Sequence, residues 1–309
     1  MKIRTAVIGV GYLGRYHAEK YAKLPTSELV AVVDNDLPTA KTIAAQYQTQ
    51  ALSAYQDLIN LVDGVSIAVP TQHHYAIAKF FLEHGVHVLV EKPITTTLSQ
   101  AEELIYLAKI HQCILQVGHL QRFNPTLIAM QPHLNQPHFI ESERLAPFRQ
   151  RGTEVNVILD LMIHDLDLIL SLVKSPIEHI EALGTVVLSN DIDLAHAQLK
   201  FKNGCVANLT ASRINPSFKR ELRIFQQNSY FTLDLHQTHL TITHKNNPEN
   251  ETIHFEKTDE LLTEINAFLT AILNNTAPIV SGEDGKNALA AALYISKLIQ
   301  STHMTKVNV

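Results

Sequence analysis

The chain has 309 residues, a length that predicts two domains. Hydrophobic residues make up 46% of it and charged residues 18%, a balance that excludes a disordered or fibrous protein. The net charge is −5 and no run of Lys or Arg occurs, so the sequence lacks the basic patch of a nucleic-acid binder. We therefore expect no nucleic-acid partner.

Nothing in the chain predicts export or a membrane span. The apolar run that begins at Thr5 is interrupted by glycines, and no cleavage site of small residues follows it. The longest apolar segment, 157–173, carries Asp160, His164 and two more aspartates, which would not cross a bilayer. The two cysteines lie far apart and outside any zinc-ligand spacing. We expect reduced thiols, no metal, no membrane partner and a cytoplasmic location.

Short apolar runs alternate with helical patterns through the first 118 residues. Five of these runs are predicted to be buried strands: 3–9, 29–34, 64–69, 86–91 and 113–118. Apolar runs without polar alternation are typical of a parallel sheet with helices on both faces. The prediction for residues 1–120 is a doubly wound α/β domain, the Rossmann NAD-binding architecture.

A glycine motif follows the first strand and opens the first helix. Gly9, Gly11 and Gly14 have the G-x-G-x-x-G spacing, which lets the backbone turn sharply and approach a pyrophosphate at the helix start. The second strand ends in Asp34, twenty positions beyond Gly14, where a carboxylate can hold the adenosine ribose hydroxyls. A 2′-phosphate beside this carboxylate would be repelled by about 4 kcal/mol. NAD is therefore expected rather than NADP.

Lys92 follows the fifth strand, in Glu91-Lys92-Pro93, at the sheet edge where this architecture binds ligands. A lysine near a cationic nicotinamide gives up its proton more readily, so it can bind a substrate hydroxyl and share in moving its proton. From position alone, a surface lysine paired with Glu91 explains the residue equally well. Thr71, after the fourth strand, is expected to line the nicotinamide pocket.

The pattern changes after Pro125, where strands follow one another without intervening helices. The predicted strands are 193–201, 205–213, 220–225, 231–235 and 240–243. They predict an α+β domain, residues 121–309, with an open-faced, mostly antiparallel sheet that helices at 157–173 and 259–273 cover. The final helix, which begins at 281 or 282, is compatible with packing on either domain. Such a sheet often forms a subunit interface, so we expect a homodimer or homotetramer.

Asp160 and His164 lie four residues apart in a helical pattern and therefore share one face. A histidine titrates near neutral pH and suits the role of general base toward an alcohol, with Asp160 orienting it or binding substrate. The alternative is a structural histidine, since the chain has 17 histidines and most must be bystanders.

These motifs together resemble the glucose-fructose oxidoreductase, inositol dehydrogenase and MocA family, and the resemblance spans nearly the whole chain. It implies reversible oxidation of a sugar or cyclitol hydroxyl, with Lys92 and His164 as the catalytic lysine and histidine and Asp160 as their neighbouring carboxylate. The cofactor-binding residues expected on this basis are Gly9, Gly11, Tyr12, Leu13, Gly14, Asp34, Val69, Pro70, Thr71, His74, Glu91 and Lys92.

Segments 118–125 and 160–167 are similar to the bacterial UDP-N-acetylglucosamine 3-dehydrogenase branch of this family. This resemblance implies oxidation of the sugar 3-hydroxyl for lipid A amino-sugar biosynthesis. The expected substrate-binding residues are Lys92, Arg122, Asn124, Arg149, Asp160 and His164, and the diphosphate is assigned to Arg144, Arg149, Arg151 or Arg213. An Arg-rich segment from 143 to 151 suits an anionic ligand, although a solvated loop would have the same composition.

Two other functions remain open at this point. One is a dehydrogenase of a free sugar or of inositol. The other is a non-catalytic NAD-sensing regulatory protein, because one fold can serve unrelated functions. Retention of Lys92, Asp160 and His164 together counts against the regulatory protein.

Overall fold

The structure is a computed structural model that describes residues 2–149 and 155–305. The chain forms two compact units. Unit 1 comprises Met1–Leu120 and Asp259–Lys286, and unit 2 comprises Gln121–Thr258 and Asn287–Val309. In the described ranges, no helix is both long and apolar enough to cross a membrane.

Unit 1 is built on a six-stranded parallel sheet in the order β3-β2-β1-β4-β5-β6. Its strands are β1 (Ile3–Ile8), β2 (Ser27–Val33), β3 (Gln50–Leu52), β4 (Gly64–Ile67), β5 (His87–Glu91) and β6 (Leu115–Gly118). The helices along the same stretch are α1 (Gly14–Lys23), α2 (Leu37–Tyr47), α3 (His74–Glu83) and α4 (Leu98–Ile110), with short 3-10 turns η1 (Tyr55–Leu58) and η2 (Thr71–His73). This confirms the predicted doubly wound fold.

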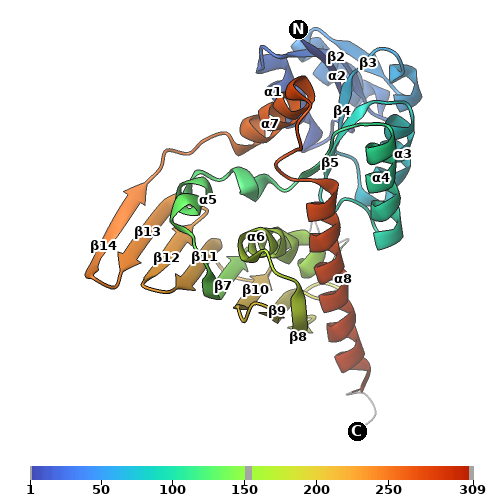
Figure 1. Cartoon of the computed structure of the whole chain (residues 1–309). Coiled ribbons are helices and arrows are strands. Elements are labelled where there is room, and N and C mark those ends of the chain that lie inside the picture. Colours follow the sequence, from blue (N-terminus) through green and yellow to red (C-terminus); the bar gives the residue numbers. More distant parts are fainter. Residues whose placement is uncertain (1, 150–154, 306–309) are drawn as a thin grey trace. The chain divides into compact units, whose positions relative to one another are not determined.

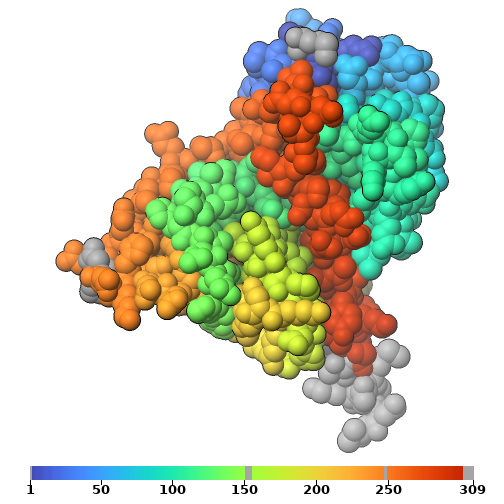
Figure 2. Space-filling model, in the orientation of Figure 1, coloured from blue at the N-terminus to red at the C-terminus, as the bar shows by residue number. Residues whose placement is uncertain are grey.

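The chain order of the strands reverses between β1 and β4. From β1 the chain moves outward to β2 and β3, and from β4 it moves the other way to β5 and β6. Ligands of open α/β sheets bind beyond the carboxyl ends of the strands at such a reversal. On one side of the sheet α3 and α4 lie next to each other and form part of the surface of this unit (Figures 1 and 2).

Helix α7 (Glu260–Asn274) belongs to unit 1 although it comes late in the chain. Its fully buried Ile265, Phe268 and Leu269 join the cluster that contains Val7 and Val32, and α7 lies against α1 (Figure 1). The prediction that this helix covers the second sheet is wrong. An amphipathic pattern identifies the apolar face of a helix, but it does not identify the surface against which that face packs.

Unit 2 contains an eight-stranded sheet in the order β14-β13-β12-β11-β7-β10-β9-β8. The strands are β7 (Pro137–Leu145), β8 (Ile177–Thr185), β9 (Leu194–Phe201), β10 (Val206–Ser212), β11 (Lys219–Gln226), β12 (Ser229–Asp234), β13 (His239–His244) and β14 (Asn247–His254). Neighbouring strands pair antiparallel except β7 and β10, which pair in parallel. The predicted open-faced, mostly antiparallel sheet is confirmed.

One face of this sheet is apolar and is covered by helices. In β10, Ala207, Leu209 and Ala211 are buried at every second position. They share a core with residues of α5 (Pro125–Met130), α6 (Ile163–Val173) and α8 (Gly282–Thr305). The opposite face carries cross-strand charged pairs, including Arg223 with Glu141. The final helix α8 begins in unit 1 and continues into unit 2 after Lys286.

Candidate active site

The glycine turn between β1 and α1 has the geometry of a pyrophosphate-binding loop. Gly9 has a φ of +82°, and a Cβ there would lie 2.6 Å from Val69 Cγ1. At Gly14 a Cβ would lie 1.7 Å from the Gly9 carbonyl oxygen, so only glycine permits this close packing of helix on strand. A Cβ at Gly11 would meet no atom within 4 Å. The space beside Gly11 is therefore open to a ligand that approaches the backbone.

A cavity of about 510 Å³ adjoins this turn within unit 1. It is lined by Ile8, Gly9, Gly11, Val33, Asp34, Asn35, Ser53, Ala54, Tyr55, Gln56, Ala68, Val69, Pro70, His73 and Ile77. The lining combines apolar side chains with a few polar groups, as nucleotide sites do. The wall formed by residues 53–56 was not predicted from the sequence, because the three-residue strand β3 that precedes it has no apolar run.

Asp34 is held at the end of β2 by two backbone hydrogen bonds. Val10 N donates to Oδ2 over 2.9 Å, and Asp36 N donates to Oδ1 over 3.0 Å. Each carboxylate oxygen can accept a further hydrogen bond. The carboxylate therefore lines the cavity in a fixed orientation, with acceptor capacity for ribose hydroxyls.

His74 joins the two loops that follow β4 and β5. The side chain is buried, and its two ring nitrogens lie 2.8 Å from the Val69 carbonyl oxygen and 2.9 Å from the Pro93 carbonyl oxygen. Burial lowers the pKa of this imidazole, and the hydrogen bonds with the two carbonyls oppose the change. His74 therefore connects these two loops, and its contact with the cofactor stays a prediction.

Lys92 follows the last residue of β5, at the same carboxyl edge of the sheet as the glycine turn. Its backbone N–H lies 3.3 Å from Glu91 Oε2, and Glu91 Oε1 lies 3.0 Å from Nε2 of His17 on α1. Burial alone would raise the pKa of the Glu91 carboxyl, but the hydrogen bond with His17 lowers it below its ordinary value. Lys92 and Thr71 are both half-buried, so their side chains remain partly accessible.

Asp160 and His164 lie in unit 2, where a π-helical turn runs directly into α6. The π-helix η5 spans Ile158–Met162 and includes Asp160, whereas His164 is the second residue of α6. Both side chains are half-buried. The sequence predicted one regular helix here. π-helical turns occur frequently at functional sites, and this one includes Asp160, one of the predicted site residues.

Two bidentate ion pairs fix α6 at Asp165 and Asp167, directly after His164 in the chain. Arg144 donates from Nε and Nη2 to Asp165, and Arg122 donates in the same way to Asp167, over 2.6–2.9 Å. Arg144 and Asp165 are nearly fully buried. The expectation that Arg144 binds a diphosphate is therefore wrong. Arg122, expected beside the sugar, directs its guanidinium edge to Asp167.

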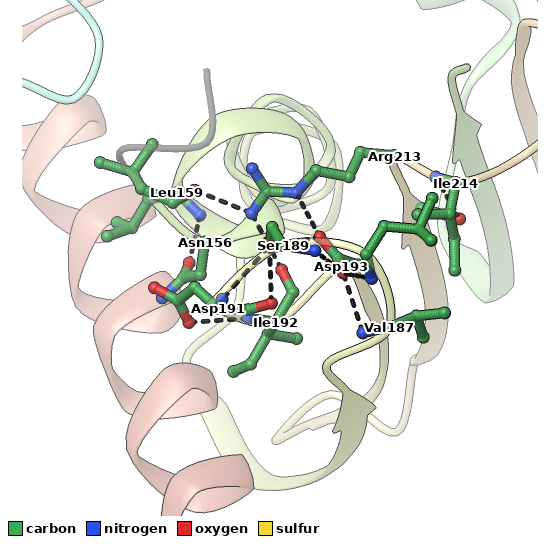
Figure 3. A network of polar contacts seen from close by, with 12 residues as sticks. Asn156, Leu159, Val187, Ser189, Asp191, Ile192, Asp193, Arg213 and Ile214 are labelled. Atoms are coloured by element: carbon green, nitrogen blue, oxygen red, sulfur yellow. Dashed lines mark hydrogen bonds and ion pairs between the residues drawn. The ribbon is translucent and has the colours of Figure 1, made fainter. Parts of the chain in front are cut away.

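Arg213 and Asn124 also have structural partners inside unit 2. Nη2 of Arg213 donates to the carbonyl oxygens of Val155 and Ile192, and its Nε lies 3.3 Å from Asp193 (Figure 3). Arg213 is buried, so the expected diphosphate contact is wrong for this arginine too. Asn124 is fully buried and caps α5 by accepting from Thr126 N. Its expected place beside the sugar is therefore not supported.

Arg149 is the exposed arginine among the described candidates for the diphosphate. Its guanidinium carbon lies 5.4 Å from the centroid of the Phe218 ring, which leaves the guanidinium edge accessible. Arg151 lies outside the described residues. Arg149 thus remains the described candidate for an anionic ligand in the 143–151 segment.

The chain matches both domains of one oxidoreductase family. Residues 3–119 match the family described as "Oxidoreductase family, NAD-binding Rossmann fold", and residues 130–231 match "GFO/IDH/MocA C-terminal domain". These matches cover the glycine turn and Lys92 in unit 1, and Asp160 and His164 in unit 2.

Relatives and solved structures extend this likeness along almost the full length. The chain is 37% identical to UDP-N-acetylglucosamine 3-dehydrogenase of Acidithiobacillus ferrooxidans, over 97% of this chain and 98% of that protein. A solved structure of that enzyme matches with a TM-score of 0.93 over 97% of this chain and 99% of the other, at 38% identity.

Inositol dehydrogenases match at lower identity. Myo-inositol 2-dehydrogenase of Thermotoga maritima is 24% identical over 99% of both chains. The structure of scyllo-inositol dehydrogenase from Lactobacillus casei, with bound NAD(H) and scyllo-inositol, matches with a TM-score of 0.83 at 20% identity, over 98% of both chains. At this identity the structural likeness concerns the fold.

Proposed function

Since the chain belongs to the GFO/IDH/MocA family of oxidoreductases, we propose that it oxidises the 3-hydroxyl of UDP-N-acetylglucosamine with NAD as hydride acceptor. The family match and this relative make the protein an oxidoreductase that acts on CH–OH groups. The observation that carries the finer proposal is the 37% identity over 97% of the chain to an enzyme of that name. The resulting 3-oxo sugar nucleotide suits an aminotransferase of lipid A amino-sugar biosynthesis.

The cofactor proposal rests on unit 1. Its glycine turn, the space beside Gly11 and the fixed carboxylate of Asp34 fit a dinucleotide. NAD is favoured over NADP because a 2′-phosphate at Asp34 would meet a carboxylate held in place. When bound, the nicotinamide accepts the hydride that leaves the carbinol carbon.

The protein's residues would handle the hydroxyl proton. We propose that Lys92 donates a hydrogen bond to the substrate oxygen, while His164 takes the proton as the carbon becomes a carbonyl. Asp160 orients the imidazole or binds the substrate. The hydrogen of the carbinol C–H bond leaves as hydride with both bonding electrons, and the O–H proton goes to the imidazole. The products are a ketone, reduced cofactor and one proton. Arg149 is the proposed contact for the substrate diphosphate.

We also propose a homodimer or homotetramer that forms through the open face of the unit 2 sheet. The broad polar face, with pairs such as Arg223 and Glu141, supports this assembly. Light scattering of the purified protein would give its mass, and a monomer would contradict the proposal. A cytoplasmic location is supported by the two free thiols, Cys113 and Cys205.

The decisive experiment compares wild type with Lys92→Met and His164→Asn, using UDP-N-acetylglucosamine and following NADH absorbance. We expect turnover by wild type, loss of roughly 100-fold or more in kcat for either variant, and nearly unchanged NAD affinity. Normal turnover by Lys92→Met would refute its role.

If myo-inositol or a free sugar were oxidised faster than the sugar nucleotide, the proposed substrate would be wrong, although the protein would still be a dehydrogenase. NAD binding without turnover across the panel would favour the regulatory protein.

A further inference from the structure

A buried histidine on α1 lies against the carboxylate that precedes Lys92. The His17 side chain is fully buried, and its Nε2 lies 3.0 Å from Glu91 Oε1. Its other ring nitrogen, Nδ1, has no hydrogen-bond partner among the described residues. A buried polar atom left without a partner costs free energy. The contact with Glu91 therefore has to compensate for burying this side chain.

The glycine at the end of β6 makes room for the same carboxylate. Gly118 is the partner of Glu91 in the β5–β6 register, and a Cβ there would lie 2.9 Å from the Glu91 carboxyl carbon. The second oxygen, Oε2, accepts from the Lys92 backbone N–H over 3.3 Å. Three features therefore hold the Glu91 carboxylate in place. They are the imidazole of His17 on α1, the missing side chain at Gly118 on β6 and the backbone N–H of Lys92.

The surroundings of the two ring nitrogens indicate which of them carries the proton. A neutral imidazole with its proton on Nε2 donates to Glu91 and leaves only a lone pair at Nδ1. An imidazolium would bury an unpaired N–H donor at Nδ1, which is more costly. The arrangement therefore combines a donor at His17 Nε2 with an ionised Glu91 carboxylate. The other titratable groups whose charges act on this carboxylate are Lys92 and His74 of α3.

We propose that His17 is a positioning residue for Lys92, because it keeps the Glu91 carboxylate ionised and oriented directly before the lysine. This inference rests on the proposed catalytic role of Lys92. An ionised carboxylate at this position accepts from the Lys92 amide and attracts the Lys92 ammonium that hydrogen-bonds the substrate oxygen. His17 acts through Glu91 and needs no contact with substrate.

Loss of the His17 donor has a defined consequence for the pH dependence of kcat. Burial would then act on Glu91 with less opposition, so the pKa of its carboxyl would rise and the charge would be lost at a higher pH. Protonation of the proposed base His164 also contributes to the acid limb, and a raised pKa of Glu91 adds a second protonation in that range. Activity should therefore fall at a higher pH in the acid range than it does in wild type. NAD affinity should change little, since the cavity and Asp34 are untouched.

The test compares three substitutions at one position. In His17→Gln the amide nitrogen lies near the place of Nε2, in His17→Asn it lies near the place of Nδ1, and His17→Phe has no donor. We expect His17→Phe and His17→Asn to lower kcat about tenfold and to shift the acid limb upward by about one pH unit. His17→Gln should retain most of the wild-type kcat and should shift the acid limb little. The NAD dissociation constants of all three variants should stay within about twofold of wild type.

The same substitutions in a Glu91→Gln background test whether His17 acts through the carboxylate. With the charge already removed, His17→Phe should lower kcat by less than about twofold further. Full additivity would overturn the proposal, as would equal behaviour of the Gln and Asn variants or an unshifted acid limb. Failure of the proposed function is distinguishable, because Lys92→Met would then retain turnover.

His87→Phe is the matched control, since His87 begins the strand that Glu91 ends and its Nδ1 accepts from Ile114 N. It should lower stability without moving the pH profile. If His17→Phe does not fold, Gly118→Ala displaces the carboxylate from the opposite side and should produce the same upward shift of the acid limb. An unshifted profile in a folded, NAD-binding Gly118→Ala protein would contradict the proposal.

Discussion

Asp34 is oriented by the backbone before any ligand arrives. The amides of Val10 and Asp36 hold its two oxygens, so ribose hydroxyls would meet a carboxylate whose position needs no adjustment. Preorganised acceptors of this kind gain affinity because little freedom is lost on binding. The same rigidity makes the position unfavourable for a 2′-phosphate, because the carboxylate cannot turn away without losing two hydrogen bonds.

Replacing Asp34 with Ala should weaken NAD binding by roughly tenfold to 100-fold, the range for hydrogen bonds to a charged acceptor. NADP binding should weaken less or improve, because the repulsion of about 4 kcal/mol is removed. Fluorescence titration of both cofactors measures the ratio. Asp36→Ala is the control, since Asp36 is exposed and its carboxylate accepts from Thr39. Equal losses for both cofactors in Asp34→Ala would contradict the assignment.

Residue types and spacing predicted Gly9, Asp34 and Lys92 at the ends of strands, and the structure has them directly after β1, β2 and β5. The arginines could not be assigned in the same way. Arg144 and Arg122 lie 21 and 45 residues from the aspartates that bind them, and these partners are brought close only by the fold. An arginine that binds a buried carboxylate and one that binds a phosphate have the same appearance in a sequence.

The loop before β9 supports the π-helical turn that carries Asp160. Asp193 accepts from the backbone N–H groups of Val187, Leu188 and Ser189, and Ile192 O accepts from Val157 N (Figure 3). Burial would raise the pKa of the Asp193 carboxyl, but the hydrogen bonds from these three residues lower it to about 2. The start of η5 is therefore fixed by a loop that is itself held by one carboxylate.

The low pKa of Asp193 predicts a specific pH dependence of stability. Its folded value of about 2 lies below the ordinary 3.8, so the stabilisation is fully present above about pH 4 and is lost as pH falls toward 2. The size is roughly 2 kcal/mol from the difference of the two values. Urea unfolding from pH 2.5 to 6 should therefore show a flatter profile for Asp193→Asn than for wild type.

The control for this prediction is Asp191→Asn in the same loop, where the carboxylate accepts from Ile192 N. It should keep the steep dependence of the wild-type protein on pH. If Asp193→Asn and wild type lost stability in parallel below pH 4, the carboxylate would not be the group that holds the loop.

Helices and strands could be predicted where apolar residues form a continuous run or recur at a regular interval. The buried strands of unit 1 and the hairpin β9–β10 follow from apolar runs, alternation and the turn at Asn203 and Gly204. Strand β7 was missed because Pro137 opens it and charged residues interrupt its alternation. The π-helical turn η5 was missed because nothing in its composition separates i→i+5 from i→i+4 hydrogen bonding.

At the scale of the whole molecule, unit 1 is discontinuous in sequence. Residues 1–120 supply the sheet, but Phe268 and its neighbours on α7 complete the core beside Val7 and Val32. The change of pattern near Leu120 indicated one boundary. At Asp259 the chain enters unit 1 again, and no change in composition marks this boundary. In the structure Asp259 forms an ion pair with Lys20 of α1 at 2.8 Å. The partner of an amphipathic helix is a property of the fold.

Phe268→Ala tests this division of the chain. The ring is fully buried, so its removal should cost about 3–5 kcal/mol. Hydrogen exchange should speed up in β1 and β2, and NAD affinity should fall as the core beneath the glycine turn loosens. Phe231→Ala, a fully buried phenylalanine in β12 of unit 2, is the matched control. It should speed up exchange in β11–β13 and leave β1 and β2 protected. Because the helix follows the strands of unit 2 directly in sequence, faster exchange there in Phe268→Ala, with β1 and β2 unchanged, would show that α7 belongs to the other core.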